Sequence, residues 1–197
     1  MPKPHADAVL HFQFNLRIKN GWLSESEHLP SENYGLRKEN KPVDMIVIHA
    51  ISLPPGDFGG GYIADFFCNQ LELNAHPWFE NIKGIKVSAH FLIDRTGAIS
   101  QFVSTNMLAW HAGQSYWDGK NNCNDFSIGI ELEGCDTIPF TDKQYIKLIA
   151  LLKTLKSSYP LITDDRILGH SDISPGRKTD PGPCFSWNKI KHDGIST

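Results

Sequence analysis

The chain has 197 residues, which is enough for one domain with its own hydrophobic core. Hydrophobic residues make up 40% and charged residues 21% of it, a composition that is ordinary for a globular protein. The formal net charge of -3 argues against a nucleic-acid partner or an anionic membrane, because both require a basic surface.

Export and membrane signals are not evident in the sequence. No stretch approaches the roughly 18 to 20 apolar residues of a membrane helix, and residues 1–20 lack the apolar region of a signal peptide. The four cysteines show neither close pairs nor zinc-finger spacing. We therefore expect a cytoplasmic protein with free thiols. Nothing in the sequence implies a protein partner.

The first 40 residues are polar and irregular, and we expect them to form an extension over the core or to be partly disordered. Residues 43–48 are nearly all apolar, which predicts a strand covered on both faces and ending at His49. A loop rich in proline and glycine follows, and residues 62–73 then predict a helix.

The middle of the chain has the pattern of a β-sheet. Residues 85–93 and 98–103 read as two strands joined by turn-forming residues, which predicts a hairpin. Residues 126–133 alternate between aliphatic side chains on one face and small or acidic ones on the other, which predicts a further strand.

The strongest predicted helix covers residues 141–159, where apolar side chains recur at helical spacing. Thr141 and Gln144 have the spacing of a capping box. Residues 166–169 predict a short strand, and residues 186–191 a last short helix. Strands and helices alternate but one strand pair is a hairpin, so we expect a single α/β domain with a mixed sheet flanked by helices.

Two histidines, His49 and His170, follow predicted strands, and strand ends are where α/β folds place their sites. Two imidazoles and the carboxylate of Asp180 suit Zn²⁺, because three protein ligands leave a fourth position for water. The spacing alone is also consistent with histidines that only terminate strands. It likewise leaves Cys184 open as a third ligand in place of Asp180.

Glu131 lies in an otherwise apolar strand, so its carboxylate faces either solvent or a site. Glu133 is on the same face, and alternation does not choose between the two. Lys178, in the loop between His170 and Asp180, is on its own an ordinary surface lysine.

Six segments carry a more specific pattern when they are taken together in chain order: residues 47–56, 87–90, 109–113, 123–134, 169–175 and 177–183. Together they resemble the zinc-dependent N-acetylmuramoyl-L-alanine amidases of type 2, and within them the cytoplasmic branch that acts on 1,6-anhydromuropeptides. The resemblance implies the fold shared with peptidoglycan-recognition proteins. It predicts an N-terminal extension at residues 1–20 and an amidase domain at residues 21–197.

The resemblance also implies roles for individual residues. It implies that His49, His170 and Asp180 bind zinc, that Glu131 is the catalytic carboxylate, and that Lys178 is the catalytic lysine. It implies that Trp110 and His111 line the substrate cleft.

Three positions depart from the pattern of the family. Ala50 replaces an expected asparagine, and Lys86 and Asn122 replace arginines expected to meet the carboxylates of the peptide. Lys86 keeps the charge without the bidentate fork of arginine, whereas Asn122 loses the charge.

The implied function is hydrolysis of the amide between the lactyl group of N-acetylmuramic acid and L-alanine, in soluble muropeptides released during peptidoglycan recycling. The alternatives are a non-catalytic peptidoglycan-binding module, an amidase that acts on intact cell wall, and a general zinc peptidase. A binding module predicts broken ligands, a wall amidase predicts an export signal or wall-binding domain, and a peptidase predicts turnover of plain peptides.

Overall fold

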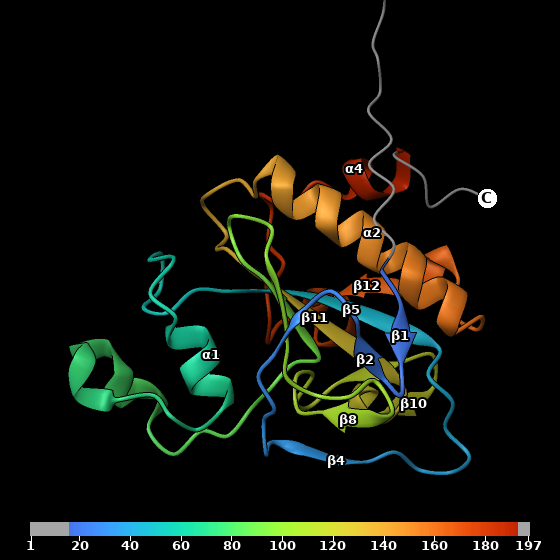
Figure 1. Ribbon diagram of the computed structural model, residues 1–197, viewed down its shortest axis with the longest axis horizontal. Coiled ribbons are helices and arrows are strands. Elements are labelled where there is room, and N and C mark those ends of the chain that lie inside the picture. Colours follow the sequence, from blue (N-terminus) through green and yellow to red (C-terminus); the bar gives the residue numbers. More distant parts are fainter. Residues whose placement is uncertain (1–15, 193–197) are drawn as a thin grey trace, which may run out of the picture.

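The computed structural model describes residues 16–192, and a six-stranded sheet lies at its centre (Figure 1). The strand order is β12-β5-β11-β6-β7-β3, and all neighbours run parallel except β6 and β7. The strands are β3 (Glu27–His28), β5 (Met45–Ile51), β6 (Phe91–Ile93), β7 (Ile99–Gln101), β11 (Ser127–Glu133) and β12 (Ile167–Gly169). The prediction of a mixed sheet flanked by helices is confirmed.

Smaller elements surround this sheet. Antiparallel pairs form between β1 (Ile18–Lys19) and β2 (Trp22–Leu23), between β4 (Tyr34–Leu36) and β8 (Met107–Ala109), and between β9 (Tyr116–Trp117) and β10 (Lys120–Asn121). The α-helices are α1 (Tyr62–Phe67), α2 (Asp142–Ser158), α3 (His170–Ile173) and α4 (Trp187–His192). Short 3₁₀ turns are η1 (Leu73–Ala75), η2 (Pro77–Ile82), η3 (Cys123–Asp125) and η4 (Asp164–Arg166).

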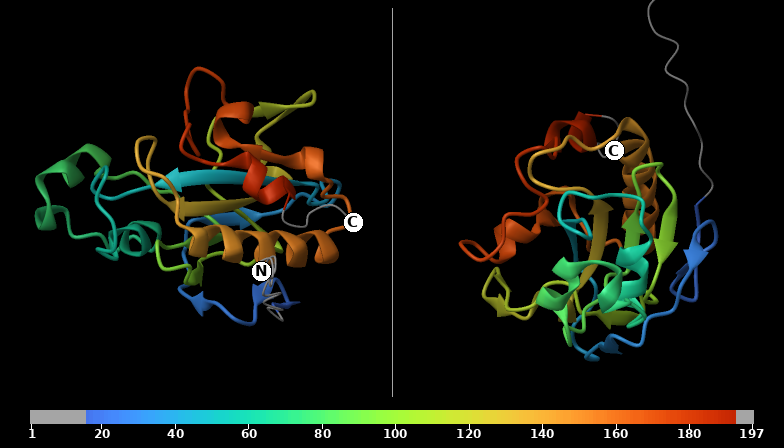
Figure 2. Two further views of the ribbon diagram at one scale, coloured as in Figure 1. Left: turned by 90° about the horizontal axis from the view of Figure 1, so that it is seen from above. Right: turned by 90° about the vertical axis from the view of Figure 1, so that its left-hand side faces the viewer.

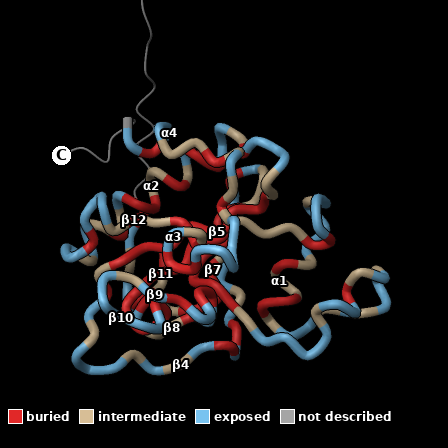
Figure 3. The backbone as a smooth tube through the Cα atoms, turned by 180° about the vertical axis from the view of Figure 1, so that it is seen from behind, coloured by how far each residue is buried: buried red, intermediate tan, exposed pale blue. Residues whose placement is uncertain are grey.

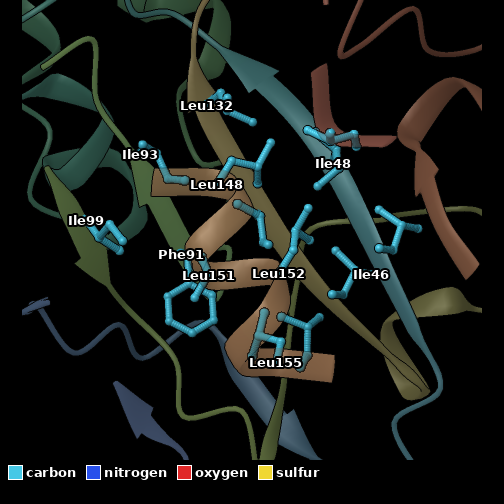
Figure 4. Packing of buried hydrophobic residues seen from close by; sticks show 14 of the residues in the cluster. Ile46, Ile48, Phe91, Ile93, Ile99, Leu132, Leu148, Leu151, Leu152 and Leu155 are labelled. Atoms are coloured by element: carbon cyan, nitrogen blue, oxygen red, sulfur yellow. The ribbon is translucent and has the colours of Figure 1, made fainter. Parts of the chain in front are cut away.

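Alternation along β5 and β11 separates a structural face of the sheet from a face that carries chemistry. The even-numbered residues of both strands pack against the leucines of α2, as Figure 4 shows for Ile46, Ile48 and Leu132. Met45 and Val47, odd-numbered residues of β5, pack instead with Ile173 of α3. Helices α2 and α3 lie on opposite sides of the sheet (Figure 2). All seven residues of β11 are buried, so both of its faces are covered.

Helix α2 is fixed to the sheet at its first turn. Thr141 and Gln144 form the predicted capping box. The Gln144 side-chain amide also donates to the carbonyls of Ile93 (3.2 Å) and Glu133 (2.9 Å), which joins the helix to β6 and β11.

Several predicted boundaries differ from the structure. Strand β5 continues to Ile51, so His49 lies within it, because the ladder with β11 extends through these residues. Helix α1 is shorter than predicted and is followed by Asn69, which has a left-handed backbone (φ 59°). The hairpin of β6 and β7 is confirmed, but β6 begins only at Phe91.

The segment from residue 16 to residue 40 lies over the core, which is one of the two predicted alternatives, but it forms the short strands β1 to β4 where an irregular chain was expected. Strand β4 lies at the surface (Figure 3). Leu16 and Leu23 are buried in the cluster beneath α2. The Arg37 guanidinium donates to the carbonyls of Thr105 (3.1 Å) and Ser127 (2.9 Å). Residues 1–15, which make up most of the predicted extension, lie outside the described residues. Within residues 16–192, every helix is too short or too polar to cross a membrane.

Candidate metal centre and catalytic site

His49, His170 and Asp180 converge at one point on the face of the sheet opposite α2. The Nδ1 atoms of the two histidines lie 2.9 Å apart, and Asp180 Oδ2 is 3.1 Å from His49 Nδ1 and 3.0 Å from His170 Nδ1. His49 projects from the middle of β5, and His170 begins α3 directly after β12. Asp180 is held nearby because its carbonyl accepts the Ser171 N–H (2.9 Å).

The His170 ring presents a lone pair to this point. Its Nε2 lies 3.0 Å from the Ala112 carbonyl, which only accepts, so Nε2 carries the proton and Nδ1 is bare. Arg177 Nη2 is also 3.3 Å from Nε2, but it has closer acceptors in the Ala112 carbonyl (2.8 Å) and the Ser174 hydroxyl (2.7 Å).

The protonation states of the group are those of metal ligands. Burial lowers the pKa of His49 to about 4, although the nearby Asp180 carboxylate opposes this shift. Burial acts to raise the pKa of Asp180, but the close approach of His170 and His49 outweighs it and holds this pKa well below its usual range. The centre therefore combines a neutral imidazole with an ionised carboxylate at neutral pH.

These residues fit a bound metal ion. Two imidazole nitrogens and one carboxylate oxygen lie at ligand-to-ligand separations, and the buried Glu131 Oε2 makes no hydrogen bond among the described residues. Such a set suits Zn²⁺ with an open fourth position. Cys184, the alternative ligand, is not part of this group within residues 16–192.

Glu131 lies beside the metal centre because it is the register partner of His49 on the neighbouring strand. Its side chain is only 8% exposed. Burial raises its pKa well above the usual range, Asp180 adds to this shift, and Lys178 opposes it. A buried carboxyl group beside a candidate metal centre, with one oxygen unbonded, suits proton transfer to and from a reacting group.

Glu133, which alternation did not separate from Glu131, has a structural role. Its Oε1 accepts the Gly59 N–H (2.6 Å), and its Oε2 accepts the Arg95 N–H (3.2 Å). Both oxygens are thereby bonded to loop backbone, whereas Glu131 keeps a free one.

Lys178 and Trp110, two further residues of the predicted site, are both exposed. Lys178 lies in the loop between His170 and Asp180, where its charge acts on Glu131 and His49. Trp110 follows β8, and its side chain is 37% exposed. Its backbone N–H donates to the Ser88 hydroxyl (3.0 Å), which fixes the tryptophan in place.

The remaining predicted residues lie in other surroundings. The Asn122 amide donates to Asp125 Oδ1 (2.7 Å), so it is bonded within its own turn. Lys86 is exposed and lines a separate pocket of about 200 Å³ beside α1. His111 is 8% exposed, and both of its ring nitrogens bond to protein: Nδ1 lies 2.9 Å from His49 Nε2, and Nε2 lies 3.2 Å from the Ser127 hydroxyl.

Ser127 and Gly129, which lie on the same face of β11 as Glu131, were not among the predicted site residues. The signal was present in the alternation of residues 126–133, which places a small or polar side chain at every second position. A carbonyl such as that of Ala112 has no signature in the sequence.

Comparison with known proteins agrees with this geometry. The sequence matches the N-acetylmuramoyl-L-alanine amidase family (Amidase_2) over residues 39–183. It is 50% identical over 173 residues to the 1,6-anhydro-N-acetylmuramyl-L-alanine amidase AmpD of Enterobacter cloacae, covering 88% of this chain and 92% of that protein.

Solved structures extend the likeness to the fold. A crystal structure of a selenomethionine derivative of AmpD superposes with a TM-score of 0.86 at 47% identity, covering 88% of this chain and 97% of that one. The amidase AmiD of E. coli, solved with anhydro-N-acetylmuramic acid-L-Ala-D-γ-Glu-L-Lys, gives a TM-score of 0.56 at 27% identity, covering 89% and 64%. The resemblance seen in the sequence is confirmed: the chain belongs to the N-acetylmuramoyl-L-alanine amidase family.

Proposed function

We propose that this protein is a zinc-dependent amidase that hydrolyses the bond between the lactyl group of N-acetylmuramic acid and L-alanine in soluble muropeptides, including their 1,6-anhydro forms. The observation that carries the proposal is a buried Glu131 with a free oxygen beside the group of His49, His170 and Asp180. The named activity of AmpD and the substrate in the AmiD structure give the chemical class of substrate.

Zinc bound by His49, His170 and Asp180 would supply Lewis acidity, which polarises a carbonyl and makes water a nucleophile near neutral pH. Glu131 accepts a proton from the attacking water and delivers it to the nitrogen of the leaving alanine. The Lys178 ammonium stabilises the negative charge that develops on the lactyl carbonyl oxygen, an effect of roughly 3 kcal/mol for one well-placed donor.

Three exposed residues are proposed to contact the parts of the substrate that do not react. The exposed face of Trp110 offers an apolar surface to the sugar or the peptide stem. Lys86 provides a positive charge for a carboxylate of the peptide, and Asn122 contributes a neutral amide that already bonds to Asp125. Lys86 and Asn122 should therefore bind the peptide carboxylates more weakly than two arginines would.

The proposed setting is the cytoplasm, where the substrate is a muropeptide released by wall turnover and reused in peptidoglycan recycling. A non-catalytic binding module is disfavoured by the complete set of ligands together with Glu131. A general zinc peptidase would cleave peptides without a muramoyl group, and an amidase of intact wall would release peptide from insoluble sacculi.

The test is mass spectrometry of the products from anhydromuramoyl-tripeptide. Zinc-loaded protein should release free tripeptide, and chelator-treated protein and Asp180→Ala should not. Equal cleavage of an acetylated tripeptide would instead indicate a general peptidase. No cleavage by protein with bound zinc would refute the amidase function.

A further inference from the structure

His49 uses both of its ring nitrogens. Nδ1 faces His170 and Asp180 in the metal centre, and Nε2 lies 2.9 Å from His111 Nδ1 on the opposite side of the ring. His111 is itself buried and does not face the metal centre directly. Either His49 Nε2 or His111 Nδ1 carries the proton between them. If it is on His49 Nε2, then His49 Nδ1 has a free lone pair for a metal.

The hydrogen bonds on the far side of His111 determine which of these two nitrogens carries the proton. The Cys123 carbonyl has no proton, so the Ser127 hydroxyl, 2.6 Å away, donates to it. The Ser127 oxygen then accepts from His111 Nε2 (3.2 Å), which places the His111 proton on Nε2. His111 Nδ1 is left with a lone pair, so it accepts from His49 Nε2, and His49 Nδ1 is bare.

We infer that His111 is a positioning residue that fixes the tautomer of His49, so that the Nδ1 lone pair of His49 always faces the metal centre. We call the series His49–His111–Ser127–Cys123 carbonyl the His111 relay. The inference rests on the proposed zinc site. Partners that fix the outer nitrogen of a metal-bound histidine strengthen metal binding by roughly 10- to 100-fold.

The face of β11 is shaped for this relay. A Cβ atom added to Gly129 would lie 2.4 Å from His111 Cγ, closer than any side chain permits. Three residues on one face of β11 therefore have different roles. Ser127 accepts a hydrogen bond from His111, Gly129 leaves room for the His111 ring, and Glu131 is the proposed general base.

The backbone next to His111 also holds the tautomer of His170, the second histidine of the metal centre. Asn124 Oδ1 accepts the N–H groups of His111 (3.2 Å) and Ala112 (2.8 Å) and so holds both residues. The side chain of His111 then contacts His49, and the carbonyl of Ala112 contacts His170 Nε2 (3.0 Å). Two consecutive residues thus determine the tautomers of both histidine ligands.

Two variants separate positioning from packing. His111→Phe keeps an aromatic ring but removes the acceptor, and His111→Asn places its side-chain oxygen near the position of Nδ1. We expect zinc affinity, measured by competition with a chromophoric chelator, to fall about 10- to 100-fold in His111→Phe and to recover to within a few-fold in His111→Asn. A purely structural role would weaken both variants equally.

The tautomers can be observed directly in the zinc-loaded wild-type protein by long-range ¹⁵N–¹H NMR of the imidazoles. The expected result is a proton on Nε2 in His49, in His111 and in His170. A proton on Nδ1 of His111 would overturn the inference even if the variants did not fold.

Two outcomes distinguish this inference from the proposed function. Wild-type zinc affinity in His111→Phe, together with loss of zinc in Asp180→Ala, would refute the relay and leave the zinc amidase intact. Tight stoichiometric zinc in Asp180→Ala would refute the zinc site itself.

Discussion

Glu131 and His49 are register partners on the parallel strands β11 and β5, so the proposed general base and a proposed metal ligand lie side by side on neighbouring strands. Their separation depends on the spacing of the backbone ladder rather than on a loop. This relationship makes the site rigid on the side of the sheet, while Lys178 and Asp180 come from the loop after α3.

Glu131→Gln should lower the turnover of muropeptide about 10²- to 10⁴-fold, because an amide does not accept the proton of the attacking water. Zinc content, measured by elemental analysis, should stay at the wild-type value, because Glu131 is not among the ligand residues. Glu133→Gln is the matched control and should retain turnover. It should lose about 1 to 3 kcal/mol of stability, because its carboxylate bonds to the Gly59 and Arg95 backbone. Wild-type turnover in Glu131→Gln would contradict the assignment.

Removing the metal should lower the melting temperature. A ligand that binds only the folded state stabilises it by about 4 kcal/mol when its concentration is 1,000 times its Kd. Differential scanning fluorimetry with and without chelator measures this shift in the wild type. Asp180→Ala should show no shift, and a shift of wild-type size in this variant would place the metal elsewhere.

Arg37→Ala should lower the free energy of unfolding by about 1 to 3 kcal/mol, because the Asp125 and Ser127 carbonyls would lose this donor. Urea denaturation followed by fluorescence measures the change. The exposed Arg17 provides the control, and Arg17→Ala should change stability by less than about 0.5 kcal/mol. Equal effects of the two substitutions would show that the Arg37 bonds contribute nothing specific.

Acid should destabilise the protein partly through His90. Burial, reinforced by Arg37, lowers the pKa of His90 from its ordinary 6.5 to about 3. The unfolded chain therefore binds a proton below pH 6.5 that the folded protein does not bind. The contribution of His90 to stability is complete above that pH and is lost as the pH falls toward about 3.

The slope attributable to one such histidine is up to about 1.4 kcal/mol per pH unit. Urea denaturation of the wild type and of His90→Asn between pH 7 and pH 5 should give the shallower slope in the variant. Parallel slopes in wild type and His90→Asn would rule out this contribution.

The sequence predicted the sheet, its hairpin and helix α2, because apolar periodicity and capping residues are local signals. The convergence of His49, His170 and Asp180 follows from strand order, which the residues alone leave open, and the resemblance to a family supplied it. The choice between Glu131 and Glu133 required the contacts of Gly59 and Arg95, which are distant in sequence.

The position of His111 was harder to predict. A histidine next to an exposed tryptophan suggests contact with substrate. Only its packing over Gly129 and its contact with His49 Nε2 reveal that it lies behind His49. For residues 16–40 the sequence left open whether they lie over the core or are partly disordered, because a polar segment can be anchored by a few long-range bonds, such as those of Arg37 and Asn33.

The metal centre joins residues that are far apart along the chain: His49 is separated from His170 by 121 positions and from Asp180 by 131. A metal bound there would close a loop that contains most of the domain. The metal centre would therefore form only after β5 and β12 have paired. A bound ion would then act as a late cross-link between the centre of the sheet and the loop of residues 171–183. Withdrawing it should open that loop to proteases first and leave α2 and the strands beneath it protected.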